Sequence, residues 1–273
     1  MSNIILGAIE RKKDSRDFNL GKIQATQEIP EEYLPDISDI KRNFQGLLPT
    51  CGAHALSHLK QIQETVETGS TQHFTPRYNW IQIKQVDGYG LEDGTDMRSV
   101  FKSLQTDGVL NYDVLGNDYS LPIDKYSDKS VVTEEMKESA NPFVIGSYAF
   151  LTSLDMYSMK QAIYKNRVSI ILMQVGPGFW HTNYPKDEER PWGHFVIATG
   201  YTKDSIRILE SADPDSQFAT KYLDKDYIRA IREFGTCVDI PNNLVPILKK
   251  KLSILKQLVQ LYLKLKDMGI FGK

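Results

Sequence analysis

Apolar residues recur three and four positions apart behind Cys51, which predicts a helix from Cys51 to about Glu67 that stops at Gly69. The repeating positions are Ala53, Leu56, Leu59, Ile62 and Val66. Similar spacing predicts helices over 77–86, 97–105 and 155–166. The stretch 111–142 is polar and contains two prolines, so we expect a long surface excursion there.

From residue 168 onward the pattern changes to β-branched and apolar runs, which are typical of buried strands. One predicted strand covers 168–175 and ends at a Gly-Pro-Gly turn. Two more, 195–201 and 205–210, are predicted to pair antiparallel across a turn at Lys203 and Asp204. Because helices come first and strands follow, the chain is predicted to be an α+β domain with a helical half and a sheet half.

The last stretch, 244–268, has two adjacent apolar stripes and six lysines on its other positions. This pattern predicts an amphipathic helix with a broad apolar face. We therefore divide the chain into an arm at 1–42 that wraps the domain, a domain at 43–240 and an appended helix at 241–273. Residues 244–268 suit self-association or docking to another protein. The alternatives are a helix folded onto its own domain and a membrane-surface helix, but we expect no membrane contact.

Composition narrows the function classes. The net charge of −2 over 273 residues lacks the basic excess of a nucleic-acid-binding protein. Only two cysteines are present, which favours a reducing compartment without a disulfide framework. The short apolar run at 4–6 has no basic stretch before it, so we expect no signal peptide and a location in the cytoplasm or a viral particle.

Cys51 is the candidate for chemistry. Its predicted place on the first turn of a helix exposes it to unpaired N–H groups and the positive end of the helix dipole, which favour a thiolate. A thiolate nucleophile needs a base, and His194 enters a buried strand directly after Trp192 and Gly193. The alternative for Cys51 is a small buried core residue, and that is the role we expect for Cys237.

Several motifs resemble the papain family of cysteine peptidases. Gln45 lies six residues before Cys51, as the oxyanion glutamine of the family does. Gly193-His194-Phe195-Val196, followed by Gly200-Tyr201, is similar to the histidine block of the family. The number of residues between Cys51 and His194 also lies in the range found in papain-type enzymes. The resemblance covers about 5–235. The arm, with Leu6-Gly7, Asp14–Phe18 and Pro35-Asp36, is similar to the start of bacterial and viral members, which have a short arm in place of a long inhibitory propeptide.

The resemblance implies a two-lobe papain-like fold and a thiol peptidase that cleaves peptides or proteins through a thioester. Cys51 would be the nucleophile and His194 its partner. Gln45 would bind the oxyanion. The segment Asp93–Arg98 is similar to the glycine loop of the family, which implies substrate contacts at Gly94 and Thr95. Beside the histidine, we expect further contacts at Gly193 and at Trp192, for which packing is the alternative role.

Two departures from the family pattern matter. Gly52 follows the cysteine where animal and plant members carry Trp. Glu210-Ser211-Ala212 stands where the family has the sequence Asn-Ser-Trp, so the shielding tryptophan is missing. We expect Glu210 to accept the Nδ1 proton of His194 and to orient the ring, with Asp213 as the second candidate.

These departures keep two rival functions open. One is a papain-fold protein with little or no catalysis, for example a component of a viral particle. The other is a cell-wall amidase or transpeptidase with the same Cys–His pair. A metal site at Cys51, His54 and His58 is a third alternative because these residues share one helix face, but the chain offers no second cluster of ligands. We expect no metal and no cofactor.

Overall fold

The computed structural model describes residues 7–14, 17, 28–186 and 189–240, together with 251, 255, 258 and 259. The chain divides into two compact units, Met1–Asp239 and Ile240–Lys273. In the second unit, residues 251, 255, 258 and 259 are helical and exposed, whereas Ile240 is neither. The rest of the predicted helix 244–268, and the parts of the arm at 1–6, 15–16 and 18–27, lie outside the described residues. Among the described residues, no helix is both long and apolar enough to cross a membrane.

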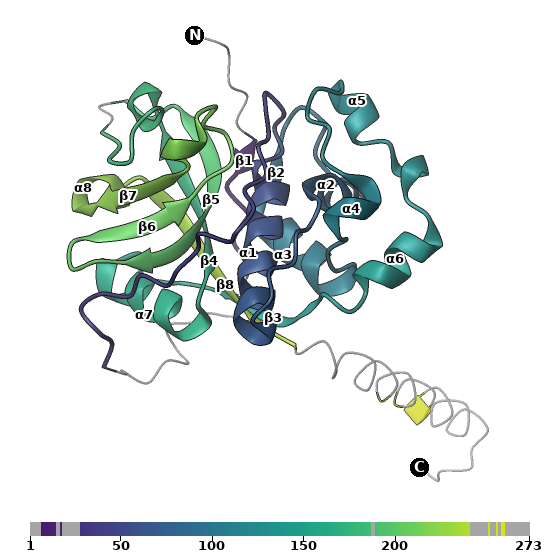
Figure 1. Ribbon diagram of the computed structural model, residues 1–273, viewed down its shortest axis with the longest axis horizontal. Helices are drawn as coiled ribbons and strands as arrows, with labels where there is room; N and C mark the ends of the chain where they lie inside the picture. The colour runs from purple at the N-terminus through teal and green to yellow at the C-terminus, as the bar shows by residue number, and fades with distance from the viewer. Residues whose placement is uncertain are drawn as a thin grey trace, which may run out of the picture. The chain divides into compact units, whose positions relative to one another are not determined.

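One half of the first unit is helical and is built around α1 (Cys51–Thr68), with α2 (Pro76–Ile83) and α3 (Met97–Thr106) against it. Gly69 ends α1 with a φ of 69°, a left-handed conformation that glycine adopts without strain. All residues of α1 from 51 to 64 are buried, so this helix is the centre of the fold (Figure 1). All three of these helices were predicted, and their observed bounds lie within three residues of the predicted ones.

The polar stretch 111–142 is more regular than the sequence predicted. It contains α4 (Tyr112–Leu115), α5 (Ile123–Tyr126) and α6 (Glu134–Ala140), and a 3₁₀ turn at Lys129–Val131. The side chains of Asn111 and Thr133 accept backbone N–H groups at the starts of α4 and α6. Such caps stabilise short helices that have too few apolar residues for periodicity to reveal them.

The other half is a six-stranded sheet in the order β3-β8-β4-β5-β6-β7, with all neighbours antiparallel. Its strands are β3 (Ile145–Phe150), β4 (Ser169–Val175), β5 (Trp192–Tyr201), β6 (Ser205–Leu209), β7 (Thr220–Asp224) and β8 (Ile231–Asp239). The predicted β5–β6 pair is present, although β5 begins at Trp192 rather than Phe195. Helices α7 (Met156–Asn166) and α8 (Lys225–Ile228) complete this half.

Alternate residues of the central strand face two separate cores. Ile170 and Leu172 belong to the core shared with α1, whereas Ile171 and Met173 belong to the core beneath α7. This two-sided burial explains why 168–175 reads as a continuous apolar run rather than as an alternation. The sheet is thus covered on both faces, with α1 on one and α7 on the other (Figure 1).

The described N-terminal residues join both halves. β1 (Ala8–Ile9) pairs in parallel with β2 (Thr95–Asp96), which leads into α3. Arg11 then forms an ion pair with Glu233 of β8, with 2.8 Å between Nε and Oε2. Further along, Tyr33 exchanges two backbone hydrogen bonds with Tyr201 at the end of β5. These contacts hold the described part of the arm against the domain.

Candidate active site

Cys51 is the first residue of α1, and its side chain is fully buried. The N-cap residue Thr50 makes no side-chain cap hydrogen bond. The first N–H groups of a helix have no partner within the helix. The start of α1 therefore presents backbone donors and a positive dipole end next to the thiol, as the sequence predicted.

The fold brings His194 and Glu210 to the same place. His194 lies near the start of β5, and Glu210 directly follows the adjacent strand β6. Nε2 of His194 is 3.4 Å from Oε2 of Glu210, and neither side chain is exposed. The thiol of Cys51 is close enough to His194 to raise the pKa of its imidazole. Residues from a helix, from a strand and from the turn after a second strand thus converge in one buried cluster.

The expected role of Nδ1 was wrong. Glu210 faces Nε2, so Nδ1 is the ring nitrogen that remains for the thiol of Cys51. Among the described residues, Nδ1 makes no hydrogen bond, so this nitrogen is open to the nearby thiol. The reason is topological: Glu210 follows the strand paired with β5, whereas Cys51 comes from α1, so the two partners reach the ring from different elements.

The cluster favours a thiolate–imidazolium pair. Burial alone would raise the pKa of Cys51, but the hydrogen bond and charge of His194, with backbone hydrogen bonds from Phe195 and Gly7, bring that pKa below its ordinary value. Burial would lower the pKa of His194, but Cys51 and Glu210 raise it to about 9. At neutral pH, proton transfer from Cys51 to His194 is therefore favourable.

Glu210, rather than the second candidate Asp213, contacts the histidine. Its carboxylate accepts the backbone N–H groups of Ala212 at 2.6 Å and of Asp213 at 2.9 Å. The side chain of Asp213 instead forms a buried ion pair with Lys221 at 2.9 Å. The turn after β6 thus fixes one carboxylate toward His194 and directs the other away from it.

Gln45 is buried beside this turn. Its Oε1 accepts the Ser211 hydroxyl at 2.7 Å, and its backbone N–H donates to the Ser211 carbonyl at 2.9 Å. Its Nε2 donates to the Leu48 carbonyl at 2.9 Å, the one acceptor found for this amide within the described part of the chain. Because an NH₂ group has two hydrogens, one remains for another acceptor. Gln45 thus connects the loop before Cys51 to the turn that carries Glu210.

Two aromatic residues near His194 were not assigned to the site from the sequence. The rings of Phe179 and Trp180 lie edge-on to the imidazole, with centroid distances of 5.9 and 6.1 Å. They cover His194 although Ala212 replaces the tryptophan that the family pattern has. The aromatic cluster before β5 was the available signal, but the sequence does not show which ring faces the histidine.

Gly52 is explained by close packing. A Cβ at this position would lie 2.7 Å from the methyl group of Thr95 and 3.0 Å from a methyl group of Val100. These contacts leave no room for the tryptophan that animal and plant family members carry there. The substitution therefore fits the packing between α1 and α3.

Three of the four residues with implied substrate contacts instead meet the N-terminal segment of the chain. The backbone N–H of Thr95 donates to the Gly7 carbonyl at 2.8 Å. A Cβ on Gly94 would lie 1.8 Å from that same carbonyl, and one on Gly193 would lie 2.4 Å from the Ala8 carbonyl. The fourth, Trp192, is 40% exposed. Gly7 and Ala8 thus occupy the place predicted for a substrate.

The histidines of α1 have partners within the protein. Nδ1 of His54 is 2.9 Å from the Thr50 carbonyl, and Nε2 of His58 accepts the backbone N–H of Asn43 at 2.8 Å. Burial lowers the pKa of His54 to about 4, so this ring is neutral at physiological pH. These contacts account for both histidines without a metal ion.

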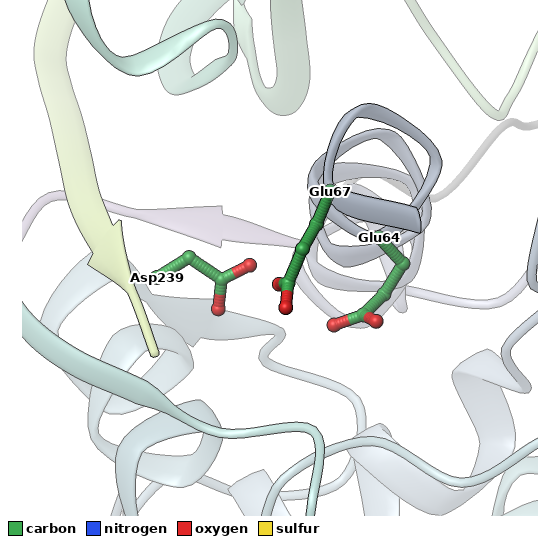
Figure 2. A group of neighbouring side chains, drawn as sticks. All are labelled: Glu64, Glu67 and Asp239. Carbon is green, nitrogen blue, oxygen red and sulfur yellow. The ribbon is translucent and has the colours of Figure 1, made fainter. Parts of the chain in front are cut away.

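A group of carboxylates lies at the far end of α1. Glu64 and Glu67 point toward Asp239 at the end of β8, as Figure 2 shows. The ammonium of Lys60 lies 2.6 Å from Glu64 and 2.5 Å from Asp239. Lys60 therefore supplies positive charge to this group, which ties α1 to β8, and we assign no metal to it.

An apolar cavity of about 480 Å³ adjoins the Gln45 loop. Its lining includes Leu47 from that loop, Tyr119 and Leu121 from the segment before α5, and Pro214 from the turn after Glu210. The cavity thus borders both segments that carry candidate site residues.

Comparison with protein families and with curated protein sequences gave no match. Solved structures share the fold. The chain resembles xylellain, a cysteine protease from Xylella fastidiosa, with a TM-score of 0.73 and 17% identity over 86% of this chain and 96% of that one.

The chain also resembles procathepsin B from Trypanosoma congolense, with a TM-score of 0.63 and 12% identity over 87% of both chains. A cysteine protease of Carica candamarcensis in complex with E-64 gives a TM-score of 0.59 and 13% identity over 77% of this chain and 99% of that one. The chain therefore has the α+β fold of papain-like cysteine proteases, as the sequence motifs predicted.

Proposed function

We propose that this protein is a papain-like thiol peptidase that acts on peptide or protein substrates. The observation that carries the proposal is the buried placement of His194 between Cys51 and Glu210. The fold supports the class of enzyme, and the residues at the start of α1 and at the β5–β6 edge have the chemistry that the class needs.

In acylation, the Cys51 thiolate would attack the substrate carbonyl carbon and form a C–S bond. The Cys51 backbone N–H and the Gln45 amide would donate to the resulting oxyanion. Collapse of this intermediate would break the C–N bond, and His194 would give its proton to the leaving amine. The product on the enzyme is a thioester.

In deacylation, neutral His194 would take a proton from water, which attacks the thioester carbonyl. The C–S bond would then break and release the carboxylic acid, returning the thiolate and the imidazolium. Glu210 would hold the ring in both steps, since its Oε2 faces the ring nitrogen that does not serve the thiol.

The proposal is tested by labelling the protein with an epoxysuccinyl peptide at neutral pH and measuring its intact mass. We expect one label, which is lost in Cys51→Ala and strongly reduced in His194→Ala. Labelling that is no faster than that of an exposed free thiol would contradict the proposal. A panel of peptide substrates and cell-wall amides would then separate a peptidase from an amidase or transpeptidase.

One observation favours a papain-fold binding protein without turnover. Gly7 lies against Cys51, and its carbonyl is held by Thr95. A substrate must displace this segment before it reaches the thiol. A protein that stays unlabelled with the probe even after the segment is displaced would be assigned to this second function.

We further propose that residues 244–268 mediate self-association. The support is the pair of apolar stripes in the sequence and the exposure of Leu255, Leu258 and Val259. Truncation after Pro241 is expected to lower the molecular mass measured by light scattering. An unchanged mass would exclude self-association through this segment.

A further inference from the structure

Arg42 faces the carboxylate oxygen of Glu210 that does not face the histidine, and no sequence motif identifies it. Its Nε donates to the Glu210 carbonyl at 3.0 Å, and its Nη2 lies 3.4 Å from Oε1 of the same residue. Nη2 also donates to the Asp213 carbonyl. The guanidinium thus contacts both ends of the turn that fixes Glu210.

The two oxygens of Glu210 face different charged groups, and both accept the backbone N–H of Asp213, at 2.9 Å for Oε1 and 3.1 Å for Oε2. Oε2 faces His194 and accepts the backbone N–H of Ala212. Oε1 accepts the backbone N–H of Asp213 and faces Arg42. A buried carboxylate is costly unless it is paired and hydrogen-bonded, and Glu210 is 1% exposed. It therefore needs a counter-charge at every stage of a reaction.

His194 cannot supply that counter-charge throughout. In the proposed mechanism it gives its proton to the leaving amine and is neutral in the thioester state. An arginine guanidinium is not deprotonated in proteins, so this positive charge is present at every step of the reaction. When His194 is neutral, Arg42 is the remaining cation among the side chains found in contact with the Glu210 carboxylate in the described structure.

We propose that Arg42 is a positioning residue that acts through Glu210: it balances the carboxylate permanently and so limits how tightly Glu210 holds the proton on His194. This inference rests on the proposed function. It also gives a physical reason for a carboxylate where the family has a neutral asparagine. Glu210 brings a negative charge to the imidazole, and Arg42 offsets part of it, so that the imidazolium can still act as an acid.

Other ionisable groups lie near the Arg42–Glu210 pair, and they must be the same in all variants that are compared. These groups are Cys51, His54 and His58 from α1, and Asp213 with its partners Lys221 from β7 and His181 from the loop before β5. Arg207 offers a matched control, because it is buried on β6 and binds the Pro35 carbonyl and Thr199 without contacting Glu210.

The experiment is a pH titration of the His194 ring signals by NMR in the full chain, assigned with His194→Ala. In the wild type we expect a midpoint of about 9. In Arg42→Gln we expect an upward shift of roughly half to one pH unit, because the carboxylate then pairs with the imidazolium alone. Arg42→Lys retains the charge and should stay near the wild-type midpoint, as should Arg207→Gln.

A double variant separates this role from a structural one. In a Glu210→Gln background, Arg42→Gln should shift the midpoint by less than half as much, because the charge through which Arg42 acts is gone. Simple loosening of the turn would move Glu210 away and lower the midpoint, so a downward shift or no shift in Arg42→Gln overturns the inference. If Arg42→Gln does not fold, Arg42→Lys is compared with Arg207→Gln. A downward shift of the His194 midpoint in Arg42→Lys alone would mean that Arg42 only holds the turn in place, which overturns the inference.

The two proposals fail in different ways. A wild-type His194 that titrates near the ordinary value of about 6.5, without a thiolate on Cys51, contradicts the proposed function itself. A wild-type midpoint near 9 that does not respond to Arg42→Gln contradicts only the role of Arg42.

Discussion

The two cysteines of this chain are both buried, yet their surroundings give them opposite properties. Cys51 begins α1 and meets His194, and its pKa is lowered. Cys237 lies inside β8, where Nε2 of Gln63 donates to its sulfur at 3.4 Å, and burial raises its pKa to about 12. Burial acts in the same direction on both thiols, so the difference comes from the partner that each one meets.

The comparison shows what turns a core cysteine into a nucleophile. A neutral amide donor does not offset the desolvation of a thiolate at Cys237, whereas an imidazolium held by a carboxylate does so at Cys51. A helix start adds backbone donors at Cys51 that the interior of a strand does not provide, because the N–H groups of β8 pair with its neighbours. Each substitution below removes one of the features that distinguish the surroundings of Cys51 from those of Cys237.

The largest effect is expected from His194→Ala, which would make Cys51 resemble Cys237. Without the imidazolium, burial dominates and the thiol stays protonated at neutral pH. We expect the peptidase rate, or the rate of probe labelling, to fall by roughly 10²- to 10⁴-fold. A variant that labels as fast as the wild type would show that Cys51 needs no histidine.

Replacing Glu210 is expected to have a smaller effect. Glu210→Ala removes the carboxylate that faces Nε2, but it leaves the direct contact between His194 and Cys51. We expect a loss of roughly 10- to 100-fold in rate and a downward shift of the pKa of His194 from about 9. Equal rates for wild type and variant would remove Glu210 from the mechanism.

Access to Cys51 can be tested with Gly7→Val. A Cβ at Gly7 would lie 2.2 Å from the Pro49 carbonyl oxygen and 2.7 Å from the Gly94 Cα, both main-chain atoms, so the segment must move. We expect iodoacetamide to label Cys51 about 10-fold faster than in the wild type, an order-of-magnitude figure for an uncovered thiolate. The exposed neighbour Glu10→Val serves as the control. Labelling of Cys51 that is no faster than in the wild type would show that the segment does not restrict access to the thiol.

The smallest effect on activity is expected at the other cysteine. Cys237→Ala removes a buried sulfur and leaves a small cavity, which should lower the free energy of unfolding by about 1 kcal/mol. The labelling rate of Cys51 should be unchanged. Chemical denaturation and intact-mass labelling of the same sample would measure both quantities. A marked loss of labelling would mean that the two cysteine regions are coupled.

Periodicity predicted the elements that bury a continuous apolar face, such as α1 and β4. It missed β7, because Thr220, Tyr222 and Asp224 alternate with buried Lys221 and Leu223, and the lysine is buried only through its ion pair with Asp213. That pair joins side chains from a loop and a strand, and such tertiary partners are invisible to a local pattern.

The candidate site shows the same limit. The motifs located Cys51 and His194 because both residues lie in short motifs that can be read along the chain. The structure brings the two residues together. They did not reveal Arg42 or the rings of Phe179 and Trp180, which reach the site through the fold. They also assigned the wrong ring nitrogen to Glu210, because the orientation of an imidazole depends on which elements lie on either side of it.

The central claim is that His194 keeps Cys51 ionised at neutral pH, and the most direct measurement is a pH titration of thiolate absorbance in the ultraviolet. It does not require a substrate to reach the thiol. Below the lowered pKa of Cys51 the thiol is protonated, and above about 9 His194 loses its proton, so the ion pair occupies the window between these values. We predict thiolate absorbance at pH 7 in the wild type and in Cys237→Ala, and its loss in Cys51→Ala and in His194→Ala. Absorbance that appears only above the ordinary thiol pKa of about 8.5, with or without His194, would contradict the account.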